Sequence, residues 1–213
     1  MKGQLITIEG ISGVGKTYYF NKLKKLCDKN KIIFNSEIND SRQFGYNKKI
    51  FDVLTSTNNR FFDTGNPKME TLLIAAKQAN DEERFINPTI EKGLTVISDR
   101  GYDTVCILEG IMYSLKYNTK LEKDIDDLYL TLTKYCKVPD KTILLVDDYD
   151  KCISRATKRD KMDYNDKEKY ILNKSYEYFI KMSLKYNERF YIINLNKLSE
   201  DEVLNRMIEI INV

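Results

Sequence analysis

The chain has 213 residues, 42% of them hydrophobic and 31% charged, a balance that predicts one soluble globular domain. Its formal net charge of +3 is too small to indicate a nucleic-acid partner. There is no histidine, which excludes a Ser-His-Asp triad, a histidine general base and histidine-ligated zinc, so any chemistry must come from carboxylates, lysine, arginine, hydroxyls, backbone amides or a bound ion.

Short apolar, β-branched segments alternate along the chain with longer helical patterns. Strands are expected at residues 5–9, 32–37, 94–98, 142–147 and 190–194. Helices are expected at residues 16–30, 46–55, 68–92, 124–136, 149–158 and 166–186, with a last one after Ser199. The strand segments are continuous apolar runs such as LITI and TILLV, typical of strands buried on both faces. This order predicts an α/β fold with a mainly parallel sheet covered by helices.

Hydropathy and cysteine usage indicate a cytoplasmic protein with no membrane partner. No stretch is apolar for long enough to span a bilayer, and the N-terminus carries no signal-peptide core. The four cysteines are far apart in the sequence and form no C-x-x-C pair. We therefore expect reduced thiols, most of them in the core.

Residues 10–17 read GISGVGKT and meet the pattern G-x-x-x-x-G-K-[ST] in full, between a strand segment and a helical one. Glycines in such a loop let backbone N–H groups face an anion, and the next helix points its positive end at the same place. Lys16 is expected to reach the β- and γ-phosphates of ATP, and the Thr17 hydroxyl to ligate Mg²⁺. The residues expected to hold ATP are Gly10, Ser12, Gly13, Val14, Gly15, Lys16 and Thr17.

Switches, motors and small kinases all use this kind of loop. A guanine-specific switch requires a motif such as NKxD, and Asn196-Lys197 lacks the aspartate at the required offset. A motor would be longer. A small kinase needs a second pocket for the acceptor, with cationic groups that hold the acceptor's phosphate.

An Asp-Arg pair, Asp99-Arg100, follows the strand segment LTVI. Side chains at the carboxyl end of a core strand point into the ligand crevice of an open α/β sheet. Asp99 is expected to hold Mg²⁺ through water, and Arg100 to contact a phosphate with its planar guanidinium.

With these motifs, the sequence resembles the thymidylate kinase family of nucleoside monophosphate kinases over nearly its whole length. IEGISGVGKT is similar to the family's EGxDGxGKT, and GLTVISDRGYDT is similar to GxxVixDRyxdS. PDKTILLVDDYDKCISRATKRDKMD and the terminal INLNKLSEDEVLNRMIEII also match family blocks in the same order. The resemblance implies a P-loop NTPase fold with a five-stranded parallel sheet, a small lid at about residues 155–166 and a homodimer.

The resemblance also implies roles for individual residues. Asp99 and Arg100 match the family's Asp-Arg pair beside the metal and the acceptor phosphate. Asp103, followed by Thr104, matches the Asp-Ser just beyond that pair, and the resemblance implies that Tyr102 and Asp103 contact the acceptor substrate. Arg155 and Arg159 match arginines around the lid, and Arg155 is expected to contact ATP. The catalytic residues implied are Lys16, Asp99, Arg100 and Arg159.

The acceptor pocket departs from the family pattern at two places. Where the family has Arg-Glu-Pro-Gly-Gly-Thr, this chain has SEINDS, which keeps Glu37 and a hydroxyl at Ser41; Arg42 is a candidate substitute for the missing arginine. The base-stacking aromatic becomes Ile74, and the arginine that reads the pyrimidine edge becomes Gln78.

Three further positions differ. The acidic residue in the phosphate loop becomes Ser12, the tyrosine after Asp-Arg stands one position later at Tyr102, and a glutamine becomes Glu109. Because a glutamine amide both donates and accepts hydrogen bonds, and isoleucine gives no π stacking, these changes predict an altered base preference.

The leading hypothesis is therefore Mg²⁺-dependent transfer of the γ-phosphoryl group of ATP to a nucleoside monophosphate, most simply dTMP. A deoxynucleoside kinase is a second hypothesis, with Glu37 as the base that a hydroxyl acceptor would require. A nucleotide-binding regulator without turnover is a third, although the intact phosphate loop argues against it.

Overall fold

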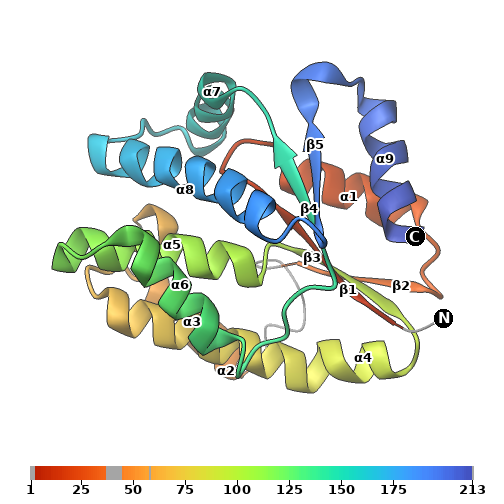
Figure 1. Cartoon of the computed structure of the whole chain (residues 1–213), viewed down its shortest axis with the longest axis horizontal. Helices are drawn as coiled ribbons and strands as arrows, with labels where there is room; N and C mark the ends of the chain where they lie inside the picture. Colours follow the sequence, from red (N-terminus) through yellow and green to blue (C-terminus); the bar gives the residue numbers. More distant parts are fainter. Residues whose placement is uncertain (1–2, 37–44, 58, 213) are drawn as a thin grey trace.

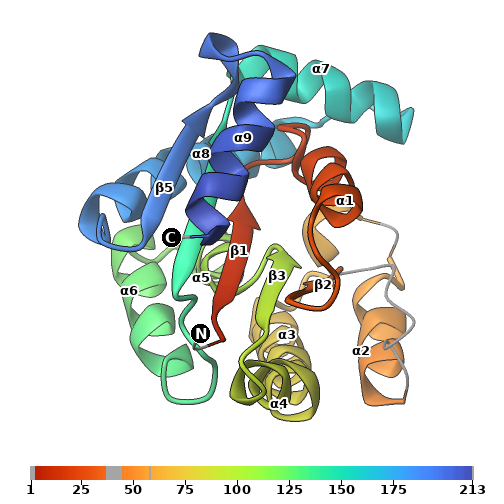
Figure 2. The same ribbon diagram turned by 90° about the vertical axis from the view of Figure 1, so that its right-hand side faces the viewer.

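The computed structural model describes residues 3–36, 45–57 and 59–212. Within these ranges, five strands form one parallel sheet in the order β2-β3-β1-β4-β5 (Figures 1 and 2). They are β1 (Leu5–Glu9), β2 (Ile32–Asn35), β3 (Thr95–Asp99), β4 (Lys141–Val146) and β5 (Phe190–Asn194). The predicted α/β fold with a five-stranded parallel sheet is confirmed.

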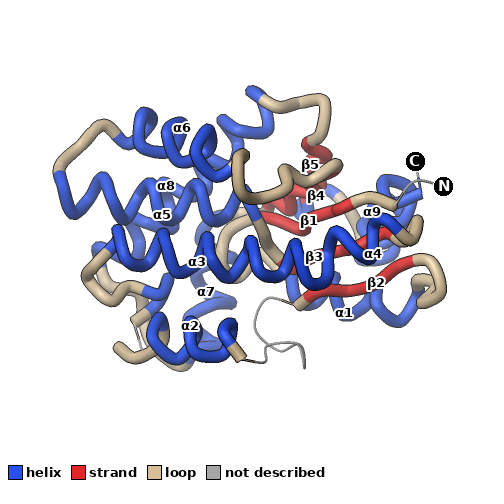
Figure 3. Tube along the Cα trace, turned by 90° about the horizontal axis from the view of Figure 1, so that it is seen from below, coloured by secondary structure: helices blue, strands red, loops and turns tan. Residues whose placement is uncertain are grey.

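Helices cover both faces of this sheet. They are α1 (Lys16–Leu26), α2 (Tyr46–Leu54), α3 (Pro67–Asp81), α4 (Asn87–Glu91), α5 (Tyr102–Tyr117), α6 (Leu121–Leu132), α7 (Tyr149–Asp160), α8 (Asp166–Lys185) and α9 (Glu200–Asn212). α1 and α9 lie on one face, and α5 and α8 lie on the opposite face (Figure 2). α3 runs beside α5, with α2 packed against α3 (Figure 3). In the described part of the chain, no helix has both the length and the apolar character of a membrane span.

The three central strands supply the middle of the core. Ile6 and Ile8 of β1, Ile97 of β3 and Ile143 of β4 are fully buried. Burial on both faces explains why these strands are continuous apolar runs in the sequence. Because the strands are parallel, their carboxyl ends meet at one edge of the sheet, and the loops that follow β1 and β3 lie next to each other there.

The helix expected over residues 68–92 is interrupted. α3 ends at Asp81, a π-helical segment covers Glu82–Ile86, and α4 begins at Asn87. Pro88 lacks an N–H group and its ring crowds the carbonyl four residues earlier, so a regular α-helical ladder cannot continue through it. The sequence pattern therefore predicted one helix where the structure has two helices joined by a π-helical turn.

α5 is the element that the sequence pattern did not predict. Ten of its sixteen residues are buried, so it lacks the polar face that marks an amphipathic helix. Gly110 allows α6 to approach closely, since a Cβ at this position would lie 2.5 Å from the Ile125 side chain. The sequence of such a buried helix shows no helical alternation of apolar and polar residues, so it does not predict a helix.

A buried ion pair lies beneath α5. Arg189 donates to both carboxylate oxygens of Asp103, at 2.6 and 2.9 Å, and to the Thr142 hydroxyl at 2.6 Å. Asp103 is fully buried, and the Arg189 side chain is 8% exposed. The prediction of Asp103 as a substrate ligand needs correction, because its carboxylate is directed into the core and paired there.

Tyr102 also lies in the core. It is 1% exposed, its hydroxyl donates to the Tyr129 carbonyl, and the two rings meet edge-on at 5.0 Å. As the first residue of α5, Tyr102 points between α5 and α6. Its predicted contact with the acceptor is likewise corrected: a shift of one position from the family pattern turns the side chain away from the sheet edge.

Arg189→Met is expected to lower the free energy of unfolding by about 3–5 kcal/mol, because it leaves the buried Asp103 carboxylate without its cation. Urea unfolding at pH 7, followed by circular dichroism, measures the loss. The double variant Asp103→Asn/Arg189→Met removes both charges and should recover part of it. A loss below about 1 kcal/mol in the single variant, the value of an exposed pair, would contradict the prediction.

Candidate functional site

Residues 10–17 connect β1 to α1 and form the phosphate loop. Gly13 has a φ of +82°, which residues with a Cβ rarely adopt. A Cβ at this position would lie 1.9 Å from the Cys152 carbonyl oxygen, so the loop packs directly against α7. α1 begins at Lys16, immediately after the loop, and places the positive end of its dipole there. The backbone and helix therefore favour an anion at the position that the motif predicts.

Lys16 lies inside the loop. Its ammonium donates to the carbonyl oxygens of Gly10 at 2.6 Å and Ile11 at 2.9 Å, and the residue is 5% exposed. Its positive charge is thus held where the phosphates of a nucleotide are expected. No nearby histidine or metal is needed to place this charge.

Thr17 and Asp99 come together at the carboxyl edge of the sheet. The Thr17 hydroxyl donates to Asp99 Oδ2 at 2.8 Å. Asp99 Oδ1 is buried and has no hydrogen-bond partner among the described residues. A hydroxyl and a carboxylate with an unused oxygen fit Mg²⁺, which prefers oxygen ligands and retains several waters. The two residues that the sequence predicts for the metal are therefore neighbours.

Glu9, the last residue of β1, is a buried carboxyl beside this site. Burial, followed by the charge of Asp103, raises the pKa of Glu9 to about 8. The Thr104 hydroxyl donates to one carboxyl oxygen, and the other has no partner among the described residues. Glu9 is thus protonated at neutral pH and adds no negative charge next to the phosphate loop.

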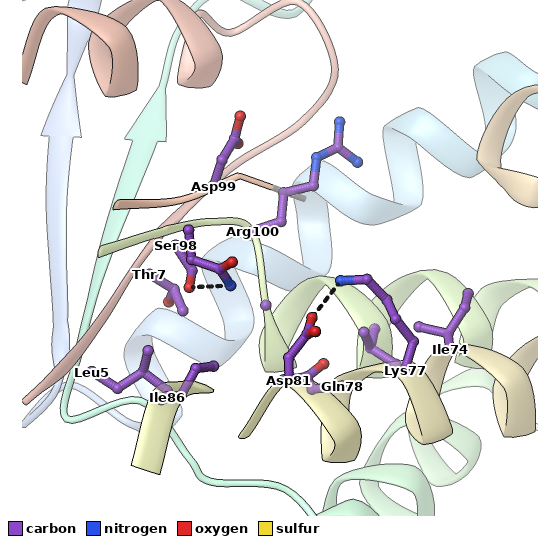
Figure 4. A pocket seen from close by; sticks show the side chains of 13 residues that line it. Leu5, Thr7, Ile74, Lys77, Gln78, Asp81, Ile86, Ser98, Asp99 and Arg100 are labelled. Carbon is purple, nitrogen blue, oxygen red and sulfur yellow. Dashed lines mark hydrogen bonds and ion pairs between the residues drawn. The ribbon is translucent and has the colours of Figure 1, made fainter. Parts of the chain in front are cut away.

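Arg100 lies at the wall of a narrow cavity of about 50 Å³ (Figure 4). Its backbone is in the left-handed region with φ +69°, a conformation unusual for a residue with a side chain. Asp99 and Arg100 approach the cavity from the end of β3, and Ile74 and Gln78 approach it from α3 (Figure 4). The predicted phosphate-binding and base-reading residues therefore face the same space.

A second cavity of about 350 Å³, called the larger cavity because it exceeds the narrow one, adjoins Arg100 and reaches the phosphate loop. Its wall combines an apolar side from α3 and α5 with charged groups near the loop. The lining residues used below are Ser12, Arg60, Phe61, Phe62, Ile74, Arg100, Val105, Leu108, Glu109, Arg159 and Tyr164. A partly apolar cavity with three arginines in its wall suits a small molecule that carries an anionic group.

The two arginines predicted around the lid both reach the phosphate loop from α7. Arg155 forms an ion pair with Asp147 at 2.6 Å and donates to the Gly13 carbonyl at 3.4 Å. Arg159 donates to the Ser12 hydroxyl at 3.2 Å. Arg155 also lines a third cavity, of about 380 Å³, with Val14, Gly15, Tyr18, Tyr19, Asp147 and Leu195. Arg155 and Arg159 thus serve two different cavities that share one loop.

Two predicted acceptor residues, Glu37 and Arg42, lie outside the described residues. Sequence reasoning missed the cavity wall formed by Arg60, Phe61 and Phe62, which belong to a short 3₁₀ helix, Arg60–Phe62. Phe61 and Phe62 both have positive φ, at +61° and +59°. Irregular backbone of this kind follows no periodic pattern, so the only available signal was the apolar pair itself inside a polar stretch.

Glu109 is a carboxyl almost fully enclosed in the wall of the larger cavity. It accepts a hydrogen bond from the Thr71 hydroxyl at 3.1 Å. Burial, reinforced by the charges of Glu70 and Asp63, raises the pKa of Glu109 to about 8. At neutral pH this group is therefore a neutral acid that can both donate and accept a hydrogen bond.

Glu109→Gln is expected to change the pH dependence of stability. The folded protein binds the Glu109 proton more tightly than the unfolded chain, so the free energy of unfolding falls as pH rises from the ordinary pKa of 4.5 to about 8. At pH 5 the variant should match the native protein, and at pH 8.5 it should be more stable by on the order of 4 kcal/mol. Urea unfolding at both values tests this, with exposed Glu209→Gln as the control. Equal stability of variant and native protein at pH 8.5 would refute it.

Comparison with known proteins gives a consistent result. Residues 8–207 match the profile of the thymidylate kinase family. The thymidylate kinase of Mycoplasma mobile is 31% identical over 196 residues, which cover 89% of this chain and 88% of that protein. The thymidylate kinase of Hahella chejuensis is 28% identical, covering 94% of this chain and 92% of that protein.

Solved structures show the same fold. The thymidylate kinase of Candida albicans superposes with a TM-score of 0.71 at 18% identity, over 99% of this chain and 92% of that one. The enzyme from Ehrlichia chaffeensis gives a TM-score of 0.68 at 19% identity, over all of both chains. With the phosphate loop, the Asp-Arg pair and the two arginines of α7 gathered at one sheet edge, these matches show that the chain belongs to the thymidylate kinase family of nucleoside monophosphate kinases.

Proposed function

We propose that this protein transfers the γ-phosphoryl group of ATP to the 5′-phosphate of dTMP, giving dTDP and ADP. The observation that supports this best is the arrangement of two cavities around one phosphate loop. The larger cavity touches Ser12 and Arg159, and the third cavity touches Gly15 and Arg155. A phosphoryl donor in one cavity and an acceptor in the other would meet at the loop.

The donor is assigned to the third cavity. Apolar and aromatic surface for a nucleoside comes from Tyr18, Tyr19 and Leu195. Gly15, which lines the same cavity, is the residue immediately before α1. The triphosphate would extend over residues 10–17, where backbone N–H groups and Lys16 neutralise its charge. Arg155, which lines the same cavity, would contact the nucleoside or its phosphates.

Thr17 and Asp99 would hold Mg²⁺, since their side chains meet and Asp99 keeps one buried oxygen unused. When bound, the ion neutralises phosphate charge and aligns the transferred group.

The acceptor is assigned to the larger cavity and its narrow extension. Arg100 would hold the acceptor phosphate, while Ile74 and Gln78 would contact the base, with Glu37 and Arg42 retained as predicted acceptor residues. An acceptor phosphate is already an anion, so no general base is required. Residues 155–166 would act as a lid that brings Arg159 to the transferred phosphoryl group and excludes water.

The base preference depends on the pocket residues in which this chain differs from the family pattern. In the narrow cavity, Gln78 can donate to or accept from a base edge, and Ile74 cannot stack on the base. Glu109 adds a neutral acid to the wall of the larger cavity, which Ile74 also lines. Leaving one buried polar group unpaired costs about 1–3 kcal/mol, which corresponds to a factor of about 5 to 150 in kcat/KM. Acceptors other than dTMP, including other deoxynucleoside monophosphates, are therefore the second candidate.

A phosphoryl-transfer panel tests the proposal. Protein, ATP and Mg²⁺ are combined with dTMP, dUMP, dCMP, dGMP, dAMP, their ribose forms or free nucleosides, and ADP release is measured. The highest kcat/KM is expected with dTMP. Transfer to nucleosides alone would establish a deoxynucleoside kinase, and tight ATP binding with no transfer to any acceptor would favour a regulator without turnover.

We also propose that the protein works in the cytoplasm as a homodimer. The family resemblance implies the dimer, and Leu72 on α3, which is 71% exposed, is one apolar side chain that a partner would cover. Light scattering at micromolar concentration should give twice the monomer mass. A monomer mass at these concentrations would refute the dimer.

A further inference from the structure

Arg60 joins the wall of the larger cavity to residues 155–166. It precedes Phe61 and Phe62, which line that cavity, and it is separated from its partners by about a hundred positions in sequence. Its guanidinium donates to Asp160 at 3.3 Å, to the Asp163 carbonyl at 2.9 Å and to Glu168 at 3.2 Å. A further bond goes to the Met162 carbonyl.

These contacts enclose the guanidinium and are directed at one structural element. The Arg60 side chain is only 10% exposed, so water screens its ion pairs little. Glu168 also closes the capping box that starts α8, where it accepts from the Asn165 backbone at 2.9 Å. Arg60 therefore contacts the turn between α7 and α8 and the cap that begins α8.

Arg60 also lies over the ring of Tyr164, 3.8 Å from its centroid. Tyr164 is 4% exposed and lines the larger cavity, yet its hydroxyl is buried without a hydrogen-bond partner among the described residues. Buried hydroxyls are nearly always paired, and an unpaired one costs about as much as a lost hydrogen bond. Because this hydroxyl is buried, a ligand in the cavity would supply the missing partner once the cavity wall shifts to let it reach the oxygen.

We propose that Arg60 and Tyr164 form one unit that couples acceptor binding to the position of the lid. Tyr164 is an acceptor-binding residue whose hydroxyl donates to an oxygen of the nucleoside monophosphate. Arg60 is a positioning residue that ties the wall of the acceptor cavity to the segment that follows Arg159. Occupation of the cavity then favours the lid arrangement that holds Arg159 at Ser12, 3.2 Å away.

This inference rests on the proposed function, and it requires in addition that the two ligands affect each other's binding affinity. If acceptor and lid are coupled, a bound ATP analogue must tighten dTMP binding, and dTMP must tighten the analogue by the same factor. The coupling factor is the ratio of the dTMP dissociation constants without and with the analogue. A purely structural role for Arg60 would change stability without changing this ratio.

Isothermal titration of dTMP, with and without AMP-PNP and Mg²⁺, measures the coupling factor. In the native protein we expect a factor of at least about 5. Arg60→Met keeps the aliphatic length but removes the fork and the stacking, and it should reduce the factor to about 1. Arg60→Lys, which keeps only a point charge, should give an intermediate value. Exposed Arg206→Met on α9 is the matched control and should behave as the native protein.

Tyr164→Phe tests the acceptor contact independently, because it keeps the ring under Arg60 and removes only the hydroxyl. The dissociation constant of dTMP should rise about 5- to 10-fold, as expected for one hydrogen bond, with no change for AMP-PNP alone. Thermal melting confirms that each variant is folded. A native factor of 1, a native factor in Arg60→Met, or native dTMP affinity in Tyr164→Phe overturns the inference. If the native protein binds no dTMP at all, the proposed function fails, and this inference fails with it.

Discussion

Replacing Lys16 by methionine is expected to lower kcat for phosphoryl transfer by about a thousandfold, the upper range for loss of one charge-stabilising group. Methionine matches the length of the side chain and lacks the ammonium that lies inside the phosphate loop, bonded to Gly10 and Ile11. The transferred group gains its interactions with this charge as the reaction proceeds. Because the charge is buried in the loop, bulk water cannot replace it.

Steady-state ADP release with saturating dTMP measures the Lys16 effect. Lys24→Met, an exposed position on the same helix, is the matched control and should keep native kcat. Circular dichroism establishes that the variant is folded. Retention of more than about a tenth of native kcat would show that the loop's backbone amides are sufficient without the lysine.

Replacing Arg159 by methionine is expected to lower kcat about 100- to 1000-fold, while the KM for ATP changes little. Arg159 donates to the Ser12 hydroxyl of the loop and pairs with its neighbour Asp160 at 2.6 Å. Its side chain is 60% exposed, which leaves it free to turn toward the reacting phosphate. Ser12 is uncharged and therefore does not hold this arginine by charge.

The control for Arg159 is Arg155→Met, one helical turn earlier. Arg155 is committed to Asp147 and the Gly13 carbonyl on the donor side, so its loss should raise the KM for ATP more than it lowers kcat. Measuring both constants for both variants separates the roles. If Arg155→Met has the larger effect on kcat, the assignment of the catalytic cation must be reversed.

The sequence predicts the phosphate loop and the Asp-Arg pair because each depends on residues that are neighbours in the chain. The alternation of strand and helix segments predicts a parallel sheet, because parallel strands need crossover connections, whereas the strand order is known only from the structure. Gly10, Lys16, Thr17, Asp99 and Arg100 are brought together as expected, since β1 and β3 are adjacent.

The remaining errors have physical causes. α5 was missed because it is buried on most sides, and the long helix near Pro88 was predicted as one because the π-helical turn preserves the direction of the chain. Tyr102 and Asp103 were assigned to the acceptor by alignment, whereas the phase of a buried helix decides which way each side chain points. No sequence pattern predicts Arg60 and Tyr164 as partners, because long-range packing alone brings them together.

The contact between Gly13 and α7 determines where the two arginines of α7 stand relative to the phosphate loop. The loop touches α7 at Cys152, and a Cβ at Gly13 would also lie 3.2 Å from the Ala156 side chain, so this part of the helix packs closely against the phosphate loop. Arg155 and Arg159 stand four residues apart on that same helix, about 6 Å from each other. One turn of α7 therefore separates Arg155, the cation on the donor side of the loop, from Arg159, the cation on the acceptor side.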